Sequence, residues 1–260
     1  MRRLYLRFIL GIAVCLLSTS KAIGSESLHG VTFRVFCAAQ MAPFSFINDN
    51  WQSPEGIDID ILLELQKRLG FELENNRIIP VPQDLALYFL QSGKSDISIG
   101  GVAATYEREK IFSFSRVYSQ SALGIVKRSN DNEITCFSSL KGKRVAVVSR
   151  SDAYDYVTSV LKESQIIEIP QLTKGFFMVY NDQCDVLVAD RYALSYFVDT
   201  VPSIELTLLT DAFNLDAGRM AMVFNQNFAY KDIINQELDR MMADGTVEKI
   251  NRKWRTKSSY

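Results

Sequence analysis

The regular alternation of short apolar segments with amphipathic ones restricts this chain to a small set of folds. From about residue 31 onward, segments of the strand type are followed by segments in which apolar residues recur at helical spacing. The strand-type segments include VTFRVF (31–36), DISIG (96–100), RVAVVS (144–149) and DVLVAD (185–190). Apolar strands separated by helices are typical of parallel-rich sheets with helices on both sides. The sequence therefore predicts an α/β fold.

Helix boundaries can be predicted from the residues that start and stop helices. GIDIDILLELQKRLG (56–70) carries Asp58 near its start and ends at Gly70, which favours a helix between them. A similar amphipathic pattern, KDIINQELDRMMADG (231–245), is expected to form a helix near the C-terminus. Three aspartates are candidate N-caps: Asp84 in residues 82–94, Asp152 in residues 150–164, and Asp190 before the next helix, where a cap role is compatible with ligand binding.

The first 22 residues differ in kind from the rest of the chain. Three arginines precede an apolar run at residues 8–17, and small residues lie around Ala22. This order is typical of a secretory signal, and the apolar run is too short to span a membrane. We expect cleavage after Ala22, with Gly24 as an alternative end, and export to the periplasm. Lipidation at Cys15 stays open.

Charge and histidine content argue against several classes of function. The chain has 29 basic and 30 acidic residues, and removal of residues 1–22 leaves 25 basic residues and a net charge of −5. No basic stripe is present, so nucleic-acid binding is not expected. The single histidine, His29, argues against a histidine-based triad or a zinc site. We expect no cofactor and no metal.

Three cysteines remain after the expected cleavage: Cys37, Cys136 and Cys184. An odd number leaves at least one thiol free or paired between chains. Export permits a disulfide, and pairing of Cys136 with Cys184 stays open because the sequence does not give their separation.

Polar residues follow three of the expected strands, where open α/β sheets bind ligands. Gly100 and Gly101 end one strand, with Arg108 beyond them. SRSD (149–152) lies at a strand-to-helix turn, and Asp190 follows VLVA directly. Arginine can hold a carboxylate bidentately, a helix N-terminus adds unpaired N–H groups, and aspartate can take an ammonium. These groups together suit a small zwitterion.

An ordered series of motifs extends this prediction. They are APFSFI (42–47), GIDIDILLELQKRLG (56–70), LQSGKSDISIGGVAATYEREKIFSFSRVY (90–118), SLKGKRVAVVSRSD (139–152), CDVLVADRYAL (184–194) and ADGTVEKINRKW (243–254). In this order they resemble the periplasmic amino-acid-binding proteins of bacterial ATP-driven importers, the solute-binding family 3. The resemblance covers nearly the whole chain after residue 22.

The resemblance implies a two-lobe periplasmic-binding-protein fold of type II. Lobe 1 would comprise residues 23–120 and 217–260, and lobe 2 residues 121–216. The chain would cross between them near residues 120–124 and 215–220. The lobes would close like a hinge over the ligand, which selects the closed state by contacting both sides.

Carried over residue by residue, the resemblance implies a ligand site. Arg108 matches the carboxylate-binding arginine, and Asp190 matches the ammonium-binding acid. Gly101 matches a position whose backbone contacts the ligand, while Ser151 and Asp152 match the loop of the second lobe that covers the carboxylate. For Asp152 the sequence favours the cap role, with its backbone N–H still available to a ligand.

Several positions depart from the family pattern. Ala103 stands where a Ser or Thr hydroxyl is usual, and Arg150 replaces a glycine. Met41 and Gln83 fall where aromatic side chains usually enclose the ligand. The family is therefore better defined than the identity of the ligand.

The predicted function is capture of a polar amino acid or similar small zwitterion and its delivery to an ABC importer, by a monomeric protein that is not an enzyme. One alternative is a sensory protein that presents its closed form to a membrane receptor. Another is an enzyme related to the cyclohexadienyl dehydratases, with Asp152, Asp190 or Tyr154 as acid or base.

Overall fold

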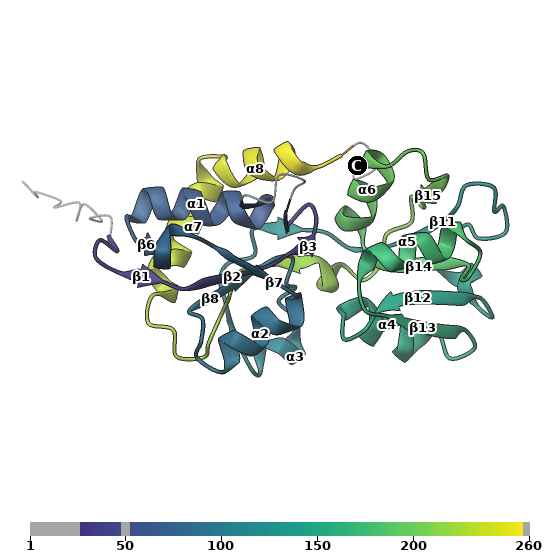
Figure 1. Cartoon of the computed structure of the whole chain (residues 1–260), viewed down its shortest axis with the longest axis horizontal. Coiled ribbons are helices and arrows are strands. Elements are labelled where there is room, and N and C mark those ends of the chain that lie inside the picture. Colours follow the sequence, from purple (N-terminus) through teal and green to yellow (C-terminus); the bar gives the residue numbers. More distant parts are fainter. Residues whose placement is uncertain (1–26, 48–52, 257–260) are drawn as a thin grey trace, which may run out of the picture.

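Each of the two lobes in the computed structural model is built around a five-stranded sheet (Figure 1). The structure describes residues 27–47 and 53–256. The expected signal segment lies outside these residues, as does Cys15. No helix among the described residues is long and apolar enough to cross a membrane.

The sheet of the first lobe has the strand order β7-β2-β8-β17-β9. Strand β2 is parallel to β7 and β8, whereas β17 is antiparallel to both of its neighbours and comes from the C-terminal part of the chain. The strands are β7 (Ile79–Val81), β2 (Val35–Ala38), β8 (Ile97–Ile99), β17 (Val223–Phe224) and β9 (Ser113–Phe114).

The single strand predicted over residues 31–36 is divided in the structure. The backbone N–H of Arg34 donates to Asp96 Oδ2 at 2.7 Å instead of to a neighbouring strand. Strand β1 (Thr32–Phe33) therefore ends before Arg34 and pairs in parallel with β6 (Glu72–Leu73). The continuous strand was a wrong prediction, because a hydrogen bond to a residue 62 positions away interrupts it.

Helices cover both faces of the first sheet. Helices α1, α7 and α8 contribute to one hydrophobic core, and α2 contributes Leu90 to a smaller core on the other side (Figure 1). The helices of this lobe are α1 (Ile57–Leu69), α2 (Gln83–Gln91), the short α3 (Tyr106–Glu109), α7 (Lys231–Ala243), α8 (Thr246–Trp254) and the 3₁₀ turn η1 (Glu74–Asn76).

The predicted stop of α1 is confirmed, and one predicted cap is wrong. Gly70 takes the left-handed conformation (φ 79°) that ends many helices. Helix α2 instead starts directly after Pro82, so Asp84 lies inside its first turn. The Asp84 carboxylate accepts from the N–H of its neighbour Leu85 at 2.9 Å, and it does not cap the helix.

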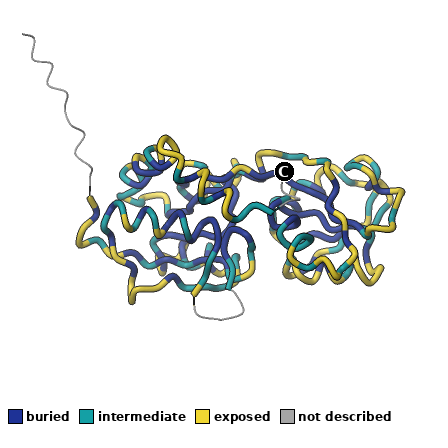
Figure 2. Tube along the Cα trace, turned by 90° about the horizontal axis from the view of Figure 1, so that it is seen from above, coloured by how far each residue is buried: buried dark blue, intermediate teal, exposed yellow. Residues whose placement is uncertain are grey.

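The second lobe has the strand order β13-β12-β14-β11-β15, with β11 antiparallel to β14 and β15. Helix α4 packs on one face of this sheet, and α5 and α6 pack on the other. The elements are β11 (Leu123–Arg128), η2 (Phe137–Leu140), β12 (Arg144–Val148), α4 (Asp152–Val160), β13 (Gln165–Ile169), α5 (Leu172–Tyr180), β14 (Val186–Asp190), α6 (Arg191–Thr200) and β15 (Leu206–Leu208). Buried segments run through the middle of each lobe (Figure 2).

The chain crosses between the lobes along a narrow antiparallel ribbon. Strand β10 (Ser119–Gln120) pairs with β16 (Arg219–Met220), which follows the 3₁₀ turn η3 (Leu215–Gly218). Two short crossing strands of this kind can act as a hinge, about which the two lobes rotate as rigid bodies.

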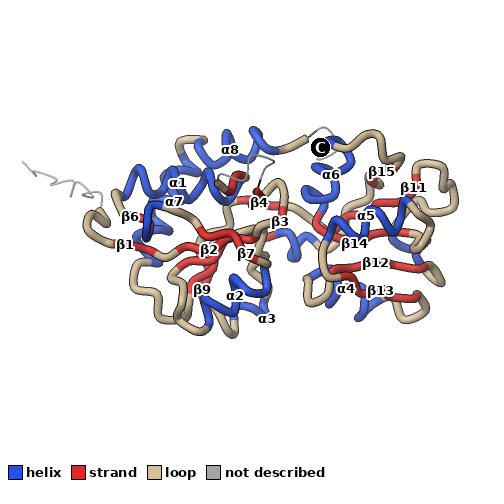
Figure 3. Tube along the Cα trace, viewed as in Figure 1, coloured by secondary structure: helices blue, strands red, loops and turns tan. Residues whose placement is uncertain are grey.

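A three-stranded sheet in lobe 1 extends toward lobe 2 (Figure 3). It contains β3 (Gln40–Met41), β4 (Ser45–Ile47) and β5 (Pro54–Glu55). Its Phe46 ring lies 5.4 Å from the Tyr196 ring of α6, so aromatic packing joins the lobes beside the crossing strands.

The cysteines do not form the disulfide that the sequence left open. Cys37, Cys136 and Cys184 are all free thiols. Burial raises the pKa of the Cys37 and Cys184 thiols to about 11, so both are protonated at neutral pH.

Candidate functional site

A cavity of about 1060 Å³ lies between the two lobes, and we call it the interlobe cleft. Its walls come from the ends of strands in both sheets and from the helices that follow them. Of the eight predicted site residues, the following seven line the cleft: Met41, Gln83, Gly101, Arg108, Ser151, Asp152 and Asp190.

Two glycines shape the cleft wall at the end of β8. Gly100 and Gly101 have φ values of 122° and 66°, which side-chain-bearing residues rarely adopt. A Cβ on Gly100 would lie 2.5 Å from the Cβ of Ala38, and one on Gly101 would lie 2.9 Å from Met41 Cγ. Glycine is therefore required at both positions by conformation and by space.

Asp58, at the start of α1, holds this glycine turn in place. Its Oδ2 accepts from the N–H groups of Gly100 at 2.7 Å and Gly101 at 2.8 Å. The side chain is fully buried, and burial raises its pKa to about 6 although both amides lower it. Burial raises the pKa of Tyr118, which directly precedes the crossing strand β10, and the negative charge of Asp58 adds to this increase.

The other hydrogen-bonding groups of the glycine turn are also engaged. Gln83 Nε2 donates to the carbonyl of Gly100 at 3.1 Å and to that of Gly101 at 3.4 Å. The N–H of Gly101 is bonded to Asp58 and is therefore not available to a ligand. Gln83 thus lines the cleft and supports the turn from the side of α2.

Substitution of Asp58 by alanine should destabilise the protein by about 2–4 kcal/mol, because two buried amides would lose their acceptor. Urea unfolding followed by circular dichroism measures the change. Glu72→Ala is the control, since Glu72 is exposed and makes no side-chain hydrogen bond within the described residues. Equal stability of the Asp58 and Glu72 variants would contradict this role.

Arg108 reaches the cleft from the short helix α3. Thr105 caps this helix through its hydroxyl, which accepts from the N–H of Arg108 at 3.4 Å. Arg108 Nη1 donates to the carbonyl of Ala103 at 3.2 Å and to Asp152 Oδ2 at 2.8 Å. Nε and Nη2 make no hydrogen bond among the residues that the structure describes, and this edge can hold a carboxylate bidentately.

Ala103 does not line the cleft, unlike the other predicted residues. Its side chain is fully buried, and the residue forms an isolated β-bridge with Met220. Its carbonyl is the group that contributes to the site, because it accepts from Arg108. The side chain that the sequence marked as a missing hydroxyl points into packed structure.

In the second lobe, Ser151 caps α4, and the prediction that Asp152 would do so is wrong. Ser151 Oγ accepts from the N–H of Tyr154 at 3.1 Å and donates to the carbonyl of Val148 at 2.7 Å. Asp152 is therefore the first residue of the helix, with its carboxylate directed to Arg108 across the cleft. Arg150 is exposed at the cleft with φ 59°, a conformation that glycine adopts more readily.

Asp190 is the last residue of β14 and caps α6, as predicted. Its Oδ1 accepts from the N–H of Ala193 at 3.1 Å. Its Oδ2 is buried and has no hydrogen-bond partner among the described residues. Burial raises the pKa of Asp190 to about 7, the Ser121 hydroxyl lowers it, and the charge of Asp152 adds to the increase. A cation placed at Oδ2 would favour the ionised form.

Sequence reasoning missed two residues that organise the site. Asp58 lies on the buried face of an apolar helix, and a charged residue at such a position is a signal of a buried hydrogen-bond network. Ser121 is buried next to Asp190, and nothing in the pattern around it distinguishes it from other serines.

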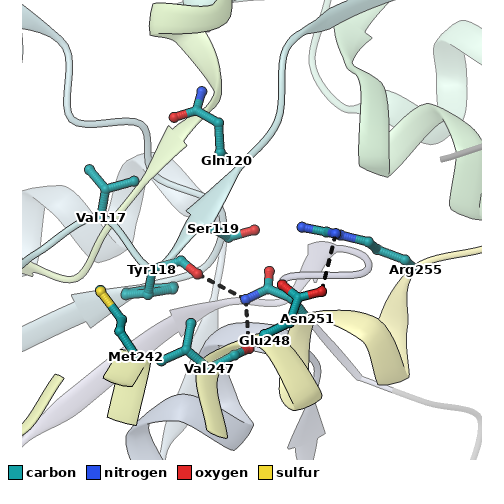
Figure 4. Close-up of a pocket in the computed structure, with 9 residues that line it drawn as sticks. All are labelled: Val117, Tyr118, Ser119, Gln120, Met242, Val247, Glu248, Asn251 and Arg255. Atoms are coloured by element: carbon teal, nitrogen blue, oxygen red, sulfur yellow. Dashed lines mark hydrogen bonds and ion pairs between the residues drawn. The ribbon is translucent and has the colours of Figure 1, made fainter. Parts of the chain in front are cut away.

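A second, smaller cavity of about 310 Å³ lies beside the crossing strands (Figure 4). Side chains of β10 and α8 line it, and Asn251 Nδ2 donates to the carbonyl of Tyr118 at 2.8 Å. None of the eight predicted site residues lines this cavity. The interlobe cleft is therefore the candidate functional site.

Comparison with known proteins relates this geometry to one family. The sequence profile of the bacterial extracellular solute-binding proteins, family 3, matches residues 33–257. A probable histidine-binding protein of Campylobacter jejuni is 25% identical, over 91% of this chain and 90% of its own. ABC transporter arginine-binding protein 1 of Escherichia coli is 24% identical, over 94% and 98%. The solved structure of an ancestral arginine-binding protein bound to arginine is 29% identical, with a TM-score of 0.78 over 86% of this chain and 97% of that one.

Two further similarities concern the alternative functions. The virulence sensor protein BvgS of Bordetella pertussis is 26% identical over 82% of this chain, which corresponds to 17% of the sensor. An ancestral amino-acid-binding protein, described as a precursor of cyclohexadienyl dehydratase, is 28% identical with a TM-score of 0.75, over 86% of this chain and 95% of that one. The fold thus occurs in a sensor and in a dehydratase lineage as well.

Proposed function

Because this chain belongs to the bacterial extracellular solute-binding proteins of family 3, we propose that it binds a polar amino acid in the interlobe cleft and delivers it to an ABC importer. The observation that carries the proposal is that Arg108 and Asp190, from different lobes, line one cavity. A cation and an acid on opposite walls match the two charged ends of a zwitterion.

In this proposal the carboxylate of the ligand binds the Nε–Nη2 edge of Arg108. The N-terminus of α4 faces Arg108 from the other lobe, and its free N–H groups and dipole support the same anion from across the cleft. The ammonium of the ligand binds Asp190 Oδ2. Met41 and Gln83 line the space left for the ligand side chain.

The ligand then stabilises the closed arrangement, because it contacts both lobes at once. We retain residues 23–120 with 217–260 as lobe 1 and residues 121–216 as lobe 2, rotating about β10 and β16. The protein acts as a monomer in the periplasm, and a membrane permease recognises the closed lobes.

We propose a binding protein and no enzyme. The relatives that match 91% and 94% of this chain are named as binding proteins. Of the candidate catalytic acids, Asp190 caps a helix and Asp152 is paired with Arg108. Both carboxylates therefore have structural partners that account for their positions.

Isothermal titration calorimetry of the chain without residues 1–22, against the twenty standard amino acids, tests the proposal. We expect saturable one-to-one binding of at least one polar amino acid. Folded protein that binds none of them would contradict the proposal. Incubation with prephenate, followed by NMR, should leave that compound unchanged, and turnover would revive the dehydratase alternative.

A further inference from the structure

The carboxylate of Asp152 is bonded to one guanidinium nitrogen of Arg108, the arginine that would anchor the ligand. Asp152 Oδ2 accepts from Arg108 Nη1 at 2.8 Å, and the two side chains are only 19% and 18% exposed. This ion pair joins lobe 1 to lobe 2 inside the cleft. A ligand that binds Arg108 therefore has a protein carboxylate as its immediate neighbour.

Acidic groups outnumber basic ones around the cleft. The acids that line it are Asp84, Asp152, Glu168 and Asp190, and the bases are Arg108 and Arg150. Asp84, Glu168 and Arg150 are exposed at the edge, whereas Asp152 and Asp190 lie deeper. The deeper part of the cleft therefore holds two carboxylates and one guanidinium, that of Arg108.

A zwitterionic ligand with a neutral side chain does not balance these charges. Its carboxylate would share Arg108 with Asp152, and its ammonium would neutralise Asp190 alone. A second carboxylate on the ligand would face Asp152, and among the described residues that line the cleft the only other cation is the exposed Arg150. Close like charges are unfavourable in a partly buried site, where solvent screens them less.

We infer that the cleft selects an amino acid whose side chain is cationic, and that Asp152 is the residue that determines this specificity. The inference rests on the proposed function and names its ligand class. In this arrangement Arg108 holds the α-carboxylate, Asp190 holds the α-ammonium, and Asp152 accepts a hydrogen bond from the side-chain cation of the ligand while remaining paired with Arg108.

L-Arginine and L-citrulline provide a matched pair of probes, because citrulline has nearly the shape of arginine without the charge. We expect calorimetry to show arginine bound at least ~10-fold more tightly than citrulline, and L-glutamate not bound. In Asp152→Asn we expect the ratio of arginine to citrulline affinity to fall to about 2-fold or less. Loss of the repelling charge should leave citrulline binding unchanged or tighter.

Asp155→Asn is the matched control variant. Asp155 is an exposed acid in the same first turn of α4 and does not line the cleft, so the wild-type preference should persist in this variant. Thermal melts establish that both variants fold. We expect Asp152→Asn to keep its helix start, because Ser151 provides the cap.

The outcomes separate the inference from the proposed function. Tighter binding of citrulline, L-glutamine or L-glutamate than of L-arginine and L-lysine would overturn the inference and leave the proposed function standing. An arginine preference that survives Asp152→Asn would overturn the role of Asp152. Absence of binding by every amino acid in the folded wild type would overturn both.

Discussion

Replacement of Arg108 by alanine is expected to weaken binding of the amino-acid ligand by about 2–5 kcal/mol, a loss of roughly 30-fold to several thousand-fold. The variant loses a charge-assisted, bidentate contact with the ligand carboxylate. It also leaves the Asp152 carboxylate without its partner, at a position where it would then repel the carboxylate of the ligand. Calorimetry with the amino acid that binds most tightly to the wild type measures the loss.

Two further arginine variants give this experiment its controls. Arg150→Ala removes the other cleft arginine, which is exposed, and we expect less than about a threefold change. Arg108→Lys keeps a charge without the planar fork, so its affinity should lie between those of the wild type and the alanine variant. Wild-type affinity in Arg108→Ala would show that another group anchors the carboxylate.

Substitution of Asp190 by asparagine should reduce ligand affinity by at least ~30-fold while leaving the fold at least as stable. The binding loss follows from removal of the charge that faces the ligand ammonium. The fold persists because asparagine caps helices as well as aspartate does, so the hydrogen bond from Ala193 is kept. A loss of binding without a loss of stability distinguishes a binding residue from a structural one.

The difference in stability between the wild type and Asp190→Asn should depend on pH. In the folded protein the pKa of Asp190 is raised to about 7, from 3.8 in the unfolded chain. Its contribution to stability is fully present below pH 3.8 and is lost as pH rises through about 7, because the buried carboxylate must then ionise. Asparagine does not titrate.

Urea unfolding without ligand should therefore give similar stabilities for wild type and Asp190→Asn near pH 4. At pH 8 the variant should be more stable than the wild type by an amount on the order of 1–3 kcal/mol. Asp155→Asn, which removes an exposed acid, should follow the wild type at both pH values. A variant that is less stable than the wild type at pH 8 would show that the ionised Asp190 has a stabilising partner.

The elements that could be predicted from sequence are those whose signals are local. The apolar spacing and the terminal glycine place α1 within one residue of its observed ends. The strands β8 and β14 were also predicted from a local signal. In an α/β chain, a short apolar run bounded by polar residues is typical of a buried strand. Arg108 and Asp190 were identified because each follows a strand that had already been placed.

Two of the errors involve competition from groups distant in the chain. Arg34 leaves its strand because Asp96 takes its N–H, and no local pattern marks that bond. Asp152 is a suitable N-cap by type, yet Ser151 caps the helix and Arg108 draws the carboxylate of Asp152 across the cleft. Ala103 was predicted to line the ligand site, and the structure places its side chain in the core, with its backbone in a β-bridge to Met220.

By itself, the sequence determined the α/β class, the order of strands and helices, and a candidate cation and acid for a zwitterion. Periodicity and turn residues act over a few positions, so they can be interpreted without a fold. Only the tertiary structure decided that Asp58 holds the glycine turn and that Asp152 shares Arg108. Those contacts join residues 42 to 44 positions apart, and only the folded chain brings such residues within hydrogen-bonding distance.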